Sequence, residues 1–79
     1  MMNADDIKKG IESMKAQKKS LEKEVFDLKT HLASSIYDMG SEELIMIANR
    51  IAHFEKQIES GRAKIEIAEL IVREVFFRD

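Results

Sequence analysis

The chain of 79 residues contains no cysteine, no proline and no tryptophan, and it has only three glycines. The lack of cysteine excludes a disulfide framework, a thiolate metal site and a cysteine nucleophile, and it fits a reducing compartment. Because proline and glycine interrupt regular structure, their scarcity favours long helices over strands and turns. Charged residues make up 35% of the chain, which fits the same class. We therefore expect an all-α fold.

The chain also lacks a long apolar run and a strong net charge, and we expect no signal peptide at its start. Its uninterrupted apolar stretches, such as Leu70–Val72 and Val75–Phe77, are far too short to span a bilayer. The first nine residues carry Asp5 and Asp6 and no apolar run, unlike a signal peptide. A formal charge of -2 is too small to indicate nucleic acid or an acidic tail. We expect a cytoplasmic protein with no membrane contact.

Two stripes of apolar or small residues, spaced alternately by three and four, run along the chain as in a heptad a/d seam. The second half carries the clearer one: Leu44, Ile47, Ile51, Phe54, Ile58, Gly61, Ile65, Ala68, Val72 and Val75. The first half carries Ile7, Ile11, Met14, Leu21, Val25, Leu28, Leu32 and then Ser35 or Ile36, with Lys18 on the seam. These stripes predict two helices, over residues 4–38 and 42–77 of a single domain 1–79.

Gly40 and Ser41 mark the boundary between the two helices. Gly40 suits the left-handed C′ position after a helix, and Ser41 suits the N-cap of the next one. A turn limited to residues 39–41 predicts that the helices fold back antiparallel as a hairpin. Lys18 then faces Gly61, and the apolar facing pairs are Leu32–Ile47, Leu28–Ile51, Val25–Phe54, Leu21–Ile58, Met14–Ile65, Ile11–Ala68 and Ile7–Val72.

A break at Ser60-Gly61 is the alternative, and it would give a three-helix bundle. The heptad phase runs through Gly61 without a skipped residue, which favours a continuous second helix.

Beyond Ala63, the second helix carries more apolar residues than one partner helix can cover, since such a partner covers a stripe of roughly 100°. A chain this short also buries little surface as a monomer. We expect a homodimer that forms a four-helix bundle at this end, with docking of a different protein as the alternative. The candidate interface residues are Ile67, Leu70, Ile71, Phe76 and Phe77.

Lysines make the first half of the first helix basic, and the candidate electrostatic contacts are Lys8, Lys15, Lys18 and Lys19. Lysines on a helix can follow a phosphate backbone. However, Glu12, Glu22 and Glu24 are interleaved, and the aromatic and arginine residues needed to read bases are missing there. We expect a solvated helix face, and a nucleic-acid-binding accessory protein is the alternative.

No residue pattern points to catalysis, a metal or a cofactor. In the antiparallel hairpin His31 and His53 are far apart, and a metal site needs several converging ligands. Carboxylates are scattered at surface spacing, and no glycine-rich phosphate loop or nucleophile elbow is present. We expect no enzyme activity and no small-molecule substrate.

A smaller apolar group lies near the predicted turn: Tyr37, Met39, Ile45 and Met46. We expect these residues to pack as the core of the turn, and a binding tip is the alternative.

The stretch Leu32–Ile58, with its turn at Gly40 and Glu-Glu-Leu opening the second helix, resembles the small two-helix aspartyl-phosphate phosphatases of sporulation control. Their signature, Ser-Gln-Glu-Leu-Asp, would fall on residues 48–52, which read Ala-Asn-Arg-Ile-Ala here. The acidic residue is absent, so that activity is not carried over. We expect a non-catalytic protein–protein interaction module, an architecture common among small regulators, inhibitors, co-chaperones and phage accessory proteins.

Overall fold

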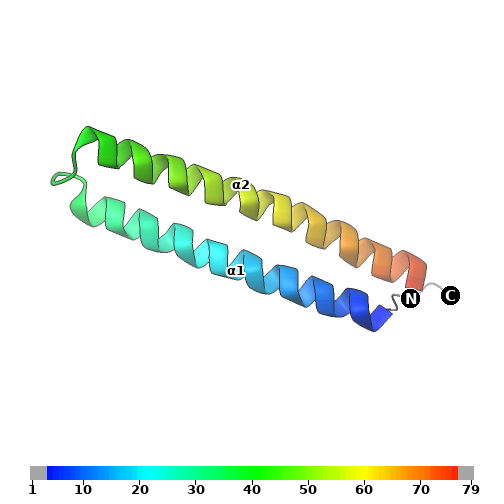
Figure 1. Ribbon diagram of the computed structural model, residues 1–79. Helices are drawn as coiled ribbons and strands as arrows, with labels where there is room; N and C mark the ends of the chain where they lie inside the picture. Colours follow the sequence, from blue (N-terminus) through cyan, green and yellow to red (C-terminus); the bar gives the residue numbers. More distant parts are fainter. Residues whose placement is uncertain (1–3, 77–79) are drawn as a thin grey trace.

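The computed structural model consists of two long helices that lie side by side and run in opposite directions (Figure 1). It describes residues 4–76, with helix α1 over Ala4–Ser35 and helix α2 over Ser41–Ile71. A π-helical segment, η1, continues α2 over Val72–Phe76. The beginning of α1 and the end of η1 lie together at one end of the hairpin, here called the open end. The opposite end, with the connecting loop, is the closed end. The predicted helical hairpin is confirmed.

Acidic side chains favour the start of both helices. Asp5 and Asp6 occupy the first turn of α1, and Glu42 and Glu43 occupy the first turn of α2. The partial positive charge of a helix N-terminus stabilises carboxylates in these positions. Helices of 32 and 31 residues give the molecule a length of 59 Å against a cross-section of 20 × 14 Å. So narrow a molecule has room for one line of buried side chains.

The two helices pack along the predicted seam. From Ile7 to Met39 and from Leu44 to Val72, side chains that are not exposed recur at alternating intervals of three and four. Every other described side chain between residues 5 and 76 is exposed. Six of the described residues are buried, with 6–9% of their surface exposed, and they occupy equivalent heptad positions: Ile11, Val25, Ile51, Ile58, Ile65 and Val72. The other seam position is half-buried, so one edge of the seam is more closed than the other.

The seam is divided into two apolar clusters, as the pairing of Lys18 with Gly61 predicted. The cluster at the open end is built on Ile11, Ile65 and Val72, and the other on Val25, Ile51 and Ile58. The two members of each predicted apolar facing pair belong to the same cluster. Between the clusters, a groove of about 380 Å³ is lined by Met14, Gln17, Lys18, Leu21, Gln57, Ser60, Gly61 and Lys64.

The connection between the helices differs from the prediction. Helix α1 ends at Ser35 rather than residue 38, and the Asp38 N–H donates to the Ser35 carbonyl oxygen at 3.0 Å. Gly40 is the N-cap of α2 with φ -75° and ψ 162°, so the left-handed C′ role predicted for it is wrong. Ser41 is the first residue of α2 rather than its N-cap. The longer loop turns the chain without a positive φ in the described residues.

The far end of α2 also differs from the prediction. Helix α2 runs through Gly61 without a break, so the three-helix alternative is wrong. The regular α-helix ends at Ile71, however, and η1 follows. Hydrogen bonds from i to i+5 widen the turn beyond 3.6 residues, so side chains after Val72 leave the heptad phase. Val75, predicted to lie on the seam, is 67% exposed for this reason.

Replacing Gly61 with Ala is expected to raise the free energy of unfolding by about 0.5–1 kcal/mol, because alanine favours a helix and restricts the unfolded chain. A Cβ atom at this position meets nothing within 4 Å. Urea denaturation at one fixed protein concentration measures the change. Gly10→Ala is the matched control, since Gly10 is also helical with open space around it. A loss of stability at Gly61 with a gain at Gly10 would contradict the expectation.

Candidate protein-binding surface

Large apolar side chains remain exposed on the outside of α2 and η1 near the open end. Ile67 is 58% exposed, Leu70 46%, Ile71 43% and Val75 67%. These four residues are called here the open-end patch. The exposure expected for Ile67, Leu70 and Ile71 is thus present, while their role as binding residues remains a prediction.

The geometry of α2 explains why the patch cannot reach α1. Ile65 and Ile67 are two residues apart, which places them ~200° apart around the helix axis. Ile65 is therefore buried against α1 at 6% exposure, whereas Ile67 points elsewhere. Leu70 and Ile71 follow Ile67 at intervals of three and four, so the three side chains are neighbours on one face. A second helix lying along this face would cover them together.

Val75 belongs to the patch because of the π-helical turn, and the sequence carried no signal for it. Its position fits the heptad seam, so regular α-helical spacing predicts burial. In the structure it instead lies four residues beyond Ile71 on the exposed surface. Phe76, predicted as an interface residue, is 40% exposed and is less exposed than Val75. Phe77, the other predicted interface residue, lies outside the described residues.

The hairpin leaves more surface in solvent than a compact protein of its mass. Its accessible surface is 6428 Å², whereas a compact monomer of 9.1 kDa exposes about 4,900 Å². Its radius of gyration is 17.7 Å, whereas a compact domain of this length has about 12 Å. The elongated shape therefore leaves a large area that association can cover.

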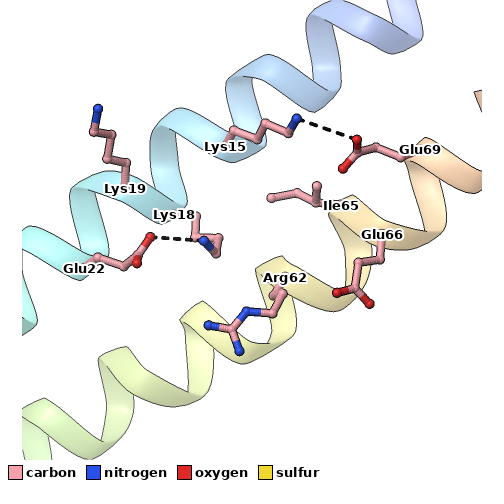
Figure 2. A pocket seen from close by; sticks show the side chains of 8 residues that line it. All are labelled: Lys15, Lys18, Lys19, Glu22, Arg62, Ile65, Glu66 and Glu69. Atoms are coloured by element: carbon pink, nitrogen blue, oxygen red, sulfur yellow. Dashed lines mark hydrogen bonds and ion pairs between the residues drawn. The ribbon is translucent and has the colours of Figure 1, made fainter.

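The predicted lysine contacts face a mixed set of charges (Figure 2). The Nζ atom of Lys15 lies 3.7 Å from the Glu69 carboxylate on α2, and that of Lys18 lies 3.1 Å from Glu22 on the same helix. Figure 2 shows Lys19 pointing away from α2. The groove here has a volume of about 570 Å³. Ile65, four cations and three carboxylates line it; the cations are Lys15, Lys18, Lys19 and Arg62, and the carboxylates are Glu22, Glu66 and Glu69.

Lys8 lies farther toward the open end, where it lines a second groove of about 450 Å³. That groove also mixes signs, because Glu12 and Glu69 line it beside Lys15 and Arg73. A phosphate backbone following these lysines would meet a carboxylate at each step. The charge pattern therefore suits ion pairs within the hairpin better than a polyanion.

The apolar group at the closed end does not pack as expected. Tyr37 is 100% exposed, and Ile45 and Met46 are also exposed, while Met39 alone is half-buried. The expectation that this group forms the core of the turn is wrong for Tyr37, Ile45 and Met46. Helix α1 ends at Ser35, so Tyr37 lies in the loop with no helix opposite it, whereas Ile45 and Met46 lie on α2 between the seam residues Leu44 and Ile47 and do not face α1. They form a second, separate exposed apolar region.

The histidines and carboxylates do not converge. Among the described residues no group of three or more His, Cys, Asp or Glu side chains could hold a metal ion. The His53 ring lies beside Phe54, with ring centroids 6.0 Å apart, and its Nε2 atom is 3.2 Å from the Gln57 side-chain amide. These are contacts within α2.

No protein-family model, curated protein or solved structure matches this chain. Along residues 4–76, neither helix combines the length and the apolar character that are needed to cross a membrane. The site therefore rests on the geometry of the hairpin itself.

Ile65→Ala and Ile67→Ala are expected to differ sharply in stability. Ile65→Ala removes a buried side chain of the open-end cluster and should lower the free energy of unfolding by about 2–4 kcal/mol. Ile67→Ala changes an exposed side chain and should change it by less than about 0.5 kcal/mol. Urea denaturation of each variant, dilute enough to keep the chain monomeric, tests this. Equal losses in both variants would mean that Ile67 packs within the hairpin.

Proposed function

We propose that this protein is a non-catalytic protein–protein interaction module that binds another helix through the open-end patch. The observation that carries the proposal is the exposure of Ile67, Leu70, Ile71 and Val75 on one side of a two-helix hairpin. Contiguous exposed apolar side chains of this kind mark interaction sites in other proteins. The proposed role is that of a small regulator, inhibitor or co-chaperone in the cytoplasm.

The proposed first partner is a second copy of the chain, which forms a four-helix bundle at the open end. Fully burying one such side chain contributes roughly 1.5–3 kcal/mol, and each patch residue is about half exposed. Four residues on each copy therefore contribute several kcal/mol, part of which offsets the entropy lost on association. Association of this strength is reversible and depends on protein concentration.

The charge distribution supports a protein partner over nucleic acid. The lysines of α1 are accompanied by Glu22, Glu66 and Glu69 around the same groove, and Lys15 already pairs with Glu69. Strong binding to a phosphate backbone needs several cations without such neighbours.

Ile71→Asp is expected to abolish association while the far-ultraviolet circular dichroism stays helical. The charge falls within the patch and not on the seam, so both buried clusters of the hairpin keep all their side chains. Sedimentation or light scattering over micromolar to millimolar concentrations measures the mass. Ile45→Asp is the matched control: it places the same substitution on α2 at another exposed isoleucine, 61% exposed against 43% for Ile71, at the closed end. The control should keep the mass of the wild type.

The outcomes separate the proposal from its alternatives. A wild-type dimer that Ile71→Asp dissociates supports self-association through the patch. A wild-type monomer that binds a hydrophobic dye, with Ile71→Asp abolishing the binding, supports a patch kept free for a different protein. An unchanged mass in Ile71→Asp, or a wild-type monomer without dye binding, would contradict the proposal.

A further inference from the structure

Four residues on the outside of α2 and η1 form a symmetric row, with two isoleucines in the middle and charges of opposite sign at the two ends. Lys64 lies three residues before Ile67, and Glu74 lies three residues after Ile71. Ile67 and Ile71 are four apart, so the spacing is three, four and three. All four side chains are exposed. These residues are called here the outer row.

The outer row has the heptad spacing of the hairpin seam, shifted by one residue. Lys64 precedes Ile65, Ile67 precedes Ala68 and Ile71 precedes Val72, which all face α1. One residue corresponds to a rotation of ~100° around the helix axis. Viewed down the axis of α2, a helix that packs on the outer row would therefore lie ~100° around α2 from α1. In a four-helix bundle each helix contacts two neighbours in about this relation.

We infer that the occupant of the outer row is a second copy of this chain, packed with its α2 antiparallel to the first α2 about a two-fold axis near Glu69. This inference rests on the proposed function, in which the open-end patch binds another helix. In this register Ile67 faces the partner's Ile71, and Lys64 faces the partner's Glu74. A two-fold axis makes each of these contacts twice.

The charges select the antiparallel arrangement. Antiparallel pairing sets two Lys–Glu pairs at the rims of the apolar contact, whereas parallel pairing in register sets Lys64 beside Lys64 and Glu74 beside Glu74. Both groups are available, because among the described residues Lys64 forms no ion pair. Within residues 4–76, Glu74 pairs only with the neighbouring Arg73, at 3.6 Å.

The outer row also borders the more open edge of the hairpin seam. The exposed Lys64 lines the groove between the two apolar clusters, together with three half-buried residues, Met14, Leu21 and Gly61. A helix along the outer row therefore lies next to apolar surface that α1 and α2 leave partly uncovered.

Charge reversal tests the register. Lys64→Glu and Glu74→Lys should each weaken the dimer by about tenfold or more, because each creates two like-charge contacts. An equimolar mixture of the two variants should form a heterodimer of wild-type affinity, since every contact then joins opposite charges. The double variant Lys64→Glu/Glu74→Lys should dimerise like the wild type. Dissociation constants come from sedimentation at low salt.

Lys56→Glu is the matched control, because it reverses an exposed lysine of α2 outside the outer row. It should leave the dissociation constant within about twofold of the wild type. A wild-type chain that stays monomeric would overturn the inference, and so would single variants that dimerise normally or a mixture that fails to associate. If Ile71→Asp dissociates the dimer while the charge variants do not, the proposed function stands and this register is wrong.

Discussion

The packing of α1 against α2 along one heptad seam is the contact on which the rest of the molecule depends. Within residues 4–76 neither helix has any other element to pack against, and only six of the side chains described there are buried. Helices of this kind draw most of their stability from such packing rather than from intrinsic propensity. The seam also sets the direction of every other side chain, because a residue's angle from the seam decides whether α1 can cover it.

The open-end patch is a consequence of this simplicity. A single neighbouring helix covers one stripe, and the C-terminal half of α2 carries apolar residues on more than one. Ile65 and Val72 occupy the covered stripe, while Ile67 and Ile71 do not. The π-helical turn enlarges the excess by moving Val75 out of the seam. An assembly with further helices, as we propose, would cover what the hairpin cannot.

The two edges of the seam differ in the ion pairs that link α1 to α2. Lys15 reaches Glu69 and Lys29 reaches Glu55, so ion pairs link the two helices beside the grooves that Ile65 and Ile58 line. These exposed pairs contribute little stability, but they favour one register of the antiparallel pair. The groove lined by Met14, Leu21 and Gly61 has no such pair linking α1 to α2 among the described residues. The proposed second copy lies on that side.

The sequence alone determined that the chain forms two helices and which side chains they bury. The three-and-four spacing that places residues on one helix face involves only residues close in sequence. The buried Ile51, Ile58 and Ile65 follow from that spacing, as does the exposure of Ile67 and Ile71. Only the tertiary structure decided where each helix ends. Helix α1 ends at Ser35, Gly40 is the N-cap of α2, and Tyr37 lies exposed in the loop between them. The π-helical turn at Val72–Phe76 moved Val75 into solvent. Such shifts depend on how the two helices meet, and spacing along one chain does not encode that.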